Sequence, residues 1–146
     1  MEQNLFFIKL GEKLVFSDKE GILKEKISID FKIELENNIA INLYEILFSL
    51  NTHLNNNKIF SINKINERYS IKNKETNDEY KLDDLLILFF KKMKENLENK
   101  EKLSLKKLIL IYDFISYEII LIIQQAAFVN ELNIINMIDN NKALRY

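Results

Sequence analysis

The sequence predicts an α/β domain in which an antiparallel meander of strands joins a strand–helix–strand unit. Three observations support this class. Short β-prone runs fill the first 35 residues, leucines at helical spacing begin near residue 40, and an apolar strand, a helix and a second strand follow one another from residue 105. The chain has 146 residues, the length of one domain, so we expect residues 1–146 to form a single domain.

The N-terminal third carries the strand signals. Leu5 to Leu10 and Leu14 to Phe16 are short β-prone runs, and Ile27 to Leu35 alternates apolar with polar residues without a break. This period of two is typical of a strand with one buried face. We therefore expect an antiparallel meander that turns one face to the core.

The middle of the chain favours helices. Ala40 to Leu54 has leucines at helical spacing, Ile59 to Ile62 reads as a short apolar turn, and Tyr69 to Leu82 is polar with weak strand signals. Leu85 to Asn99 is the clearest helix, and its C-terminal half is rich in lysine, as the helix dipole prefers. Asp83-Asp84 precedes it, and this acidic pair fits the start of a helix better than a metal site.

The C-terminal part predicts the strand–helix–strand unit. Leu105 to Ile111 contains an unbroken apolar run of strand length, Ser116 is a plausible N-cap, and Tyr117 to Asn130 has the pattern of a helix. Asn133 to Met137 then forms a short strand. Because this spacing is that of a βαβ unit, we expect parallel strands that are covered on at least one face.

Composition excludes several functions. With 21 basic and 22 acidic residues, the chain has no net field that would favour nucleic acid or an anionic membrane. It has no cysteine, and His53 is the only histidine, so we expect no metal centre. The N-terminus lacks a secretory or transit pattern, which favours the cytoplasm. Leu108 to Val129 approaches the length of a membrane span, but Asp113 and Glu118 would be unfavourable in lipid.

Several segments resemble a known family. Phe7-Ile8-Lys9-Leu10-Gly11-Glu12-Lys13 is similar to the first phosphate-binding hairpin, Gly-Ile-Asp-Leu-Gly-Thr-Thr, of the nucleotide-binding domain of DnaK-type heat-shock protein 70 chaperones. Ile59 to Ile65 and then Glu67-Arg68-Tyr69 match the family's Ala-Ile-Lys-Arg-Leu and Gly-Arg-Arg-Phe. Lys91-Lys92-Met93-Lys94 is similar to its Leu-Lys-Lys-Met-Lys.

The last block continues the resemblance in the same order. Leu108 to Ile111 resembles the family's Val-Ile-Thr-Val, Leu132 to Ile134 resembles part of Ala-Gly-Leu-Glu-Val, and Ile138 to Lys142 resembles Ile-Asn-Glu-Pro-Thr. The resemblance therefore covers nearly the whole chain. It implies an actin-like, ribonuclease H-like half-lobe, in which a mixed sheet combines the meander with the βαβ unit.

The residues that depart from the family patterns predict a loss of ATP chemistry. The phosphate-loop aspartate that holds the metal's water shell is replaced by Lys9, and the two phosphate-contacting threonines by Glu12 and Lys13, although Gly11 is kept. The carboxylate of Glu12 would repel a polyanion.

The other family positions have changed as well. The family's catalytic lysine aligns with Asn63, next to Lys64. The family's later Asn-Glu-Pro-Thr becomes Asp139 to Lys142, which includes Asn140. Tyr112 stands where the family has a proline. The family also continues beyond this point into its second phosphate loop. The resemblance therefore implies a non-catalytic protein without cofactor, and residual ATP binding through Gly11, Lys13 and Lys64 is the alternative within the enzyme class.

One helix is unusually apolar, and it suggests where a partner would bind. In the helix predicted from Tyr117 to Asn130, apolar residues occupy nearly the whole circumference. A helix that is apolar on all sides is buried on all sides. A protein partner would provide such cover, and a thicker internal core is the alternative. We therefore expect a protein-interaction or structural subunit of a stable complex, or alternatively a co-chaperone that docks onto chaperone or ribosome-associated machinery. The candidate interface residues are Ile119, Ile120, Ile122, Ile123 and Phe128.

Overall fold

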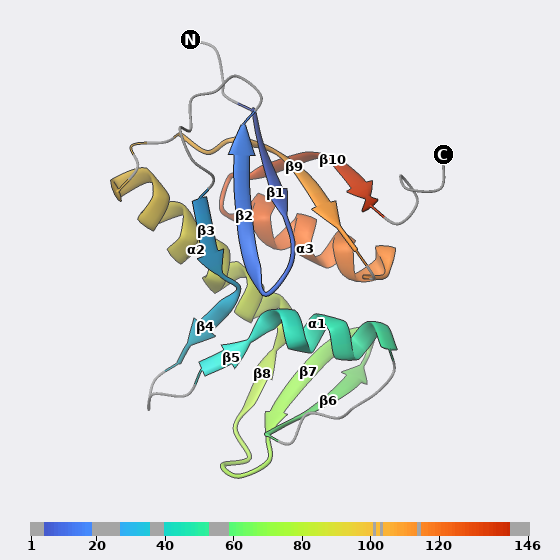
Figure 1. Cartoon of the computed structure of the whole chain (residues 1–146). Coiled ribbons are helices and arrows are strands. Elements are labelled where there is room, and N and C mark those ends of the chain that lie inside the picture. The colour runs from blue at the N-terminus through green and yellow to red at the C-terminus, as the bar shows by residue number, and fades with distance from the viewer. Residues whose placement is uncertain are drawn as a thin grey trace.

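The computed structural model describes residues 5–18, 27–35, 40–52, 59–100, 102, 104–113 and 115–140. Within these ranges there are three helices and ten strands, and the strands form one five-stranded sheet and two smaller sheets (Figure 1). The chain is therefore a mixed α/β protein, as the sequence predicts.

The five-stranded sheet has the order β10-β9-β1-β2-β3. Strands β1, β2 and β3 pair antiparallel, whereas β1, β9 and β10 run parallel. The predicted meander and the predicted strand–helix–strand unit are both confirmed, and they meet where β1 of the meander pairs with β9. The strands span Leu5–Lys9 (β1), Lys13–Asp18 (β2), Ile27–Asp30 (β3), Lys107–Tyr112 (β9) and Asn133–Asp139 (β10).

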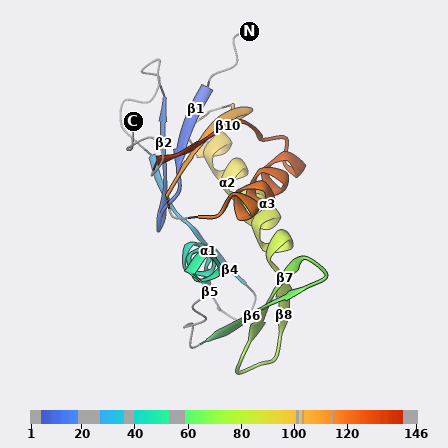
Figure 2. The ribbon, with the colours of Figure 1, turned by 90° about the vertical axis from the view of Figure 1, so that its right-hand side faces the viewer.

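Two helices, α2 (Leu82–Lys100) and α3 (Tyr117–Val129), cover one face of this sheet (Figures 1 and 2). Phe6 and Ile8 of β1 are fully buried, and their register partners on β9, Leu108 and Leu110, are buried on the same face. Lys9 alternates to the other face and is exposed. The period-two pattern of the sequence thus corresponds to one covered face.

The predicted strand from Ile27 to Leu35 is interrupted at Phe31. The N–H of Phe31 donates to the carbonyl of Glu12 (3.0 Å), and its own carbonyl accepts the N–H of Leu43 (3.0 Å). Because these bonds lead to two other segments, the chain leaves the large sheet, and β4 (Lys32–Glu34) pairs with β5 (Ala40–Asn42) instead. The expectation of one continuous strand was therefore wrong, although the alternation persists.

Helix α1 (Leu43–Thr52) begins three residues later than expected. Asn42 ends β5, and its side-chain oxygen accepts the N–H of Glu45 (3.1 Å), which is an N-cap contact. Leu43 and Leu47 are fully buried, so the leucine stripe does face the core. Residues 53 and 54, including His53, lie outside the described residues.

The third sheet was largely missed by sequence reasoning. The apolar turn expected at residues 59–62 is instead part of β6 (Phe60–Ile65), and the polar stretch after it forms β7 (Arg68–Asn73) and β8 (Glu79–Lys81). A two-residue turn, Asn66 (φ 50°) and Glu67 (φ 63°), joins β6 to β7 without the usual glycine. Asn73 holds the next turn, because its side-chain oxygen accepts the N–H groups of Glu75 and Thr76.

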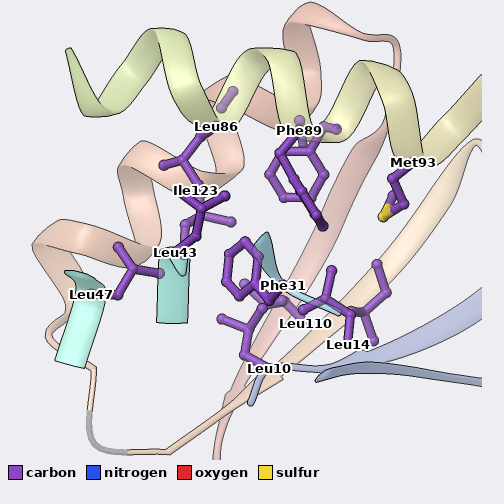
Figure 3. Packing of buried hydrophobic residues seen from close by; sticks show 14 of the residues in the cluster. Leu10, Leu14, Phe31, Leu43, Leu47, Leu86, Phe89, Met93, Leu110 and Ile123 are labelled. Carbon is purple, nitrogen blue, oxygen red and sulfur yellow. The ribbon is translucent and has the colours of Figure 1, made fainter. Parts of the chain in front are cut away.

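Helix α2 is the central element of the core (Figure 3). It begins at Leu82, and the predicted acidic pair lies in its first turn, as expected. Phe89 packs against Phe31 with ring centroids 4.9 Å apart, and Met93 is also buried. The core thus joins α1, α2, α3 and the large sheet through side chains such as Leu14, Leu43, Leu86, Leu110 and Ile123.

Polar contacts fix α2 against the end of α3. Lys94 donates to the carbonyl of Asn130 (2.9 Å), and the Asn130 amide donates to the carbonyl of Ile87 (3.0 Å). Glu131 follows in the left-handed region (φ 62°), and the N–H groups of Glu131 and Leu132 close the helix in the pattern of a Schellman motif. Lys94 is therefore a structural residue, because it bonds to the C-terminus of a neighbouring helix.

Candidate functional site

The hairpin that resembles a phosphate loop lies at the carboxyl end of β1. Lys9 is the last residue of β1, Gly11 is half-buried in the turn, and Glu12 and Lys13 are exposed. The N–H of Leu10 donates to the carbonyl of Ile111 on β9 (2.9 Å), which ties the turn to the parallel strands. The hairpin therefore presents two ammonium groups and one carboxylate to solvent.

The carboxyl end of β10 lies at the same edge of the sheet. Because β1, β9 and β10 are parallel, Lys9 pairs with Ile111, and Ile111 pairs with Ile138. Asn140 follows directly after β10 and is half-buried. Five of the seven predicted remnant positions, Lys9, Gly11, Glu12, Lys13 and Asn140, thus lie along one edge, where open α/β sheets bind their ligands.

The remaining two positions lie on another sheet. Asn63 and Lys64 are exposed residues of β6. The ammonium group of Lys64 donates to Glu118 Oε1 on α3 (2.9 Å) and lies 5.4 Å from the ring centre of Tyr69. The bond to Glu118, followed by the charge of Tyr69, raises the pKa of Lys64 above its ordinary value. Among the described residues, no hydrogen bond or ion pair connects Lys64 to the β1–β2 turn.

Tyr112 is the last residue of β9, at the carboxyl edge of the large sheet. Its side chain is buried, and burial, together with the nearby charges of Asp139 and Tyr117, raises the pKa of Tyr112. Its register partner on β10 is Asp139. At neutral pH this position therefore presents an uncharged phenol, which adds no positive charge for a phosphate at the carboxyl edge.

No group of three or more histidine, aspartate or glutamate side chains within the described ranges is placed to hold a metal ion. Asp83 and Asp84 lie in the first turn of α2, the position that suits the helix dipole.

The predicted partner interface on α3 needs correction. Ile119, Ile120 and Ile123 are at most 1% exposed, because they pack into the chain's own core against α2 and the sheet. They are therefore not available to a partner. Ile122 is half-buried against the same core, and only Phe128 projects into solvent, with 69% of its surface exposed.

The outer side of α3 nevertheless carries an exposed apolar stripe, defined by Tyr117, Leu121, Phe128 and Val129. Their exposed fractions are 59%, 37%, 69% and 61%. Three of these residues were not singled out from the sequence. Gln125 is the sequence feature that could have revealed them. A polar residue marks the outward face of the helix, and Leu121 and Val129, four positions to either side of Gln125, share that face.

An exposed isoleucine lies close to this stripe. Gln124 donates from its side chain to the carbonyl of Ile134 on β10 (3.0 Å), so the strand follows the helix closely. The next residue, Ile135, occupies a β-bulge and is 50% exposed. In the described part of the chain, no helix is both long and apolar enough to cross a bilayer.

Comparison with known proteins adds no relative to these observations. No family model matches the chain, and a search of curated proteins also gave no match.

Proposed function

We propose that this chain is a degenerate relative of the first lobe of the DnaK-type nucleotide-binding domain. It binds no cofactor, catalyses no reaction and acts in the cytoplasm through protein contacts as a subunit of a larger assembly. The absence of cysteine agrees with a reducing compartment. The exposed apolar stripe on α3 is the observation that carries the proposal.

The arrangement of the large sheet supports the relationship. The antiparallel meander β1-β2-β3 and the parallel βαβ unit β9-α3-β10 meet where β1 pairs with β9, the combination expected of an actin-like or ribonuclease H-like half-lobe. The backbone at Glu131 is compatible with the alignment on which the resemblance rests. The family pattern Ala-Gly-Leu-Glu-Val places its glycine at this position, and the backbone of Glu131 has the positive φ (62°) that favours glycine. A positive φ at this position is the conformation that a glycine of the family pattern would favour.

The side chains at the carboxyl edge support the loss of catalysis. Phosphoryl transfer depends on a positioned metal and on charges that converge on the phosphates. Here Lys9 occupies the position of the metal-holding aspartate, Glu12 adds a repelling carboxylate, and Lys64 is ion-paired to Glu118. Lys64 would have to leave both Glu118 and the Tyr69 ring before it reached a phosphate.

The α3 stripe supports protein binding. Apolar surface in water is unfavourable by roughly 25 cal/mol per Å², and exposed patches on monomers often mark binding sites. Aromatic residues such as Tyr117 and Phe128 are enriched at the centres of protein interfaces. Since α3 is anchored by Asn130, Gln124 and its buried side, it offers a rigid surface to a partner.

Titration with magnesium-ATP tests the loss of nucleotide binding. We expect isothermal calorimetry to give no saturable heat at micromolar concentrations, and Lys64→Ala to behave like the unmodified chain. Saturable heat that disappears in the Lys64→Ala variant would establish residual binding instead and would contradict the proposal.

An affinity pull-down from native cells tests the interaction surface. We expect the tagged chain to retain a fixed set of proteins through washes with salt and with ATP, and Phe128→Asp to lose them, because the substitution places a charge in an apolar contact. Phe48→Asp is the matched control, since Phe48 is an aromatic residue on α1 that is 43% exposed. Release of chaperones by ATP would indicate the co-chaperone function, and equal retention by Phe128→Asp would exclude α3 as the interface.

A further inference from the structure

The outer face of the β6–β7–β8 sheet gathers basic side chains. Ile71 of β7 is fully buried toward the core, so its neighbours in the strand, Ser70 and Lys72, alternate to the outer face, as does Arg68. On β8, Lys81 pairs with Ser70 and Glu79 pairs with Lys72, which places both on this face. The sheet lies at the far end of the molecule from β10 (Figure 1).

The three cations, Arg68, Lys72 and Lys81, outnumber the carboxylates on the same face. Lys81 lies diagonally between Arg68 and Lys72, a spacing of about 7–8 Å between neighbouring strands, where like charges repel. Among the described residues, no ion pair involves any of the three. Glu79 is the one carboxylate among the outward-facing strand residues, and its Oε1 accepts a hydrogen bond from Ser70 Oγ (2.6 Å). The face is therefore basic in a chain whose net charge is only -1.

A pocket of about 500 Å³ lies at this face, and its lining residues are Ile65, Asn66, Arg68, Tyr69, Ser70, Glu79, Tyr80 and Lys81. Its volume is within the usual range of binding pockets. Ile65 is 55% exposed and gives the pocket an apolar wall, while Arg68 and Lys81 provide two positive charges against the one negative charge of Glu79. A ligand that matches this lining has carboxylates next to an apolar side chain.

We propose that this face binds an extended acidic peptide. Carboxylates of the peptide pair with Arg68 and Lys81, and an apolar residue between them contacts Ile65. An arginine can hold a carboxylate with two parallel hydrogen bonds, which fixes the orientation of the peptide as well as adding affinity. The site is separate from the α3 stripe and does not depend on the proposed function.

The alternation of aromatic residues favours a peptide over single-stranded nucleic acid. Sheets that bind single strands stack bases on outward-facing aromatic rings. In this sheet Tyr69 and Tyr80 belong to the opposite face, together with Ile71, and the ring of Tyr69 lies beneath the Lys64 ammonium group. The two rings therefore stand on the side of the sheet opposite to Arg68 and Lys81, although both tyrosines contribute to the lining of the pocket.

Fluorescence anisotropy with a labelled short peptide of alternating glutamate and valine tests the site. We expect saturable binding that weakens as salt is added, and a loss of about tenfold or more in Lys81→Glu, the equivalent of one charge-assisted hydrogen bond. Arg68→Glu is a second variant with the same expectation. Lys91→Glu is the matched control, since Lys91 is an exposed lysine on α2 outside this face, and circular dichroism checks that each variant is folded.

Two further probes decide between the alternatives. A peptide of alternating lysine and valine should not bind, and a labelled oligothymidine should bind more weakly than the acidic peptide. Tighter binding of the oligonucleotide, or acidic-peptide binding that Lys81→Glu leaves unchanged, would overturn the proposal. Phe128→Asp should leave the peptide affinity unaltered, so a failure at this site is distinct from a failure at α3.

Discussion

Replacing Ile123 with aspartate is expected to unfold the chain. Ile123 is completely buried between α3 and the core, so an aspartate there would have neither water nor a cationic partner. An uncompensated buried charge destabilises a protein by about 3–5 kcal/mol, which is comparable with the whole stability of a small domain. Circular dichroism should show the loss of helical signal at 25 °C, and the far-ultraviolet spectrum of Phe128→Asp should match that of the unmodified chain.

The comparison of these two variants separates the two sides of α3. The same substitution on one helix is expected to abolish folding on the inner side and only partner binding on the outer side, because Phe128 is 69% exposed. The opposite outcome is that the Ile123→Asp variant folds and has the same urea midpoint of unfolding as the original chain. In that case Ile123 would have to be solvent-accessible. That outcome would place the inner side of α3 at an interface after all.

Replacing Phe31 with alanine is the second large effect, with an expected loss of about 3–5 kcal/mol in the free energy of unfolding. Phe31 is fully buried, and its ring lies 4.9 Å from that of Phe89. Its backbone also bonds to Glu12 and Leu43, so its ring sits where all three segments meet. A cavity at this junction cannot close without moving β4 or α1.

Urea denaturation measures this loss, with Phe48→Ala as the matched control. Phe48 is an aromatic residue on α1 that is 43% exposed, so we expect its truncation to change the free energy of unfolding by less than about 1 kcal/mol. An equal loss in the two variants would mean that the burial of Phe31 contributes nothing particular to stability.

The large sheet was predictable because its residues carry strong local patterns. Alternation marks β1 to β3, and the apolar run of β9 with the glutamine-bearing helix after it marks the βαβ unit. The break at Phe31 was not predictable, because it depends on hydrogen bonds to Glu12 and Leu43, which are distant in sequence. Alternation continues through the break and therefore conceals it.

The three-stranded sheet β6-β7-β8 shows why weak patterns mislead. β7 and β8 consist mainly of polar residues, and only Ile71 is a fully buried apolar side chain among them. Their turns use Asn66, Glu67 and Asn77 at positive φ rather than glycine, so the usual turn signal is absent. Strand pairing here depends on packing against α2, which no local sequence pattern records.

The α3 stripe illustrates the same limit for the candidate site. The sequence indicates that the helix is apolar on all sides, but it does not tell which side faces the core. The orientation of the helix is fixed by the contacts of Asn130 with Lys94 and Ile87 of α2 and by the contact of Gln124 with β10. Consequently Ile120 and Phe128 look alike in the sequence and differ completely in exposure.

The Gln124 contact also affects how this protein behaves at high concentration. β10 is an outer strand of the large sheet, and open strand edges are where chains polymerise into fibrils. The side chain of Gln124 already occupies the Ile134 carbonyl, and the bulge at Ile135 disrupts the regular spacing that an incoming strand would need. The chain therefore exposes apolar residues on α3 beside a strand edge that is poorly suited to uncontrolled sheet growth.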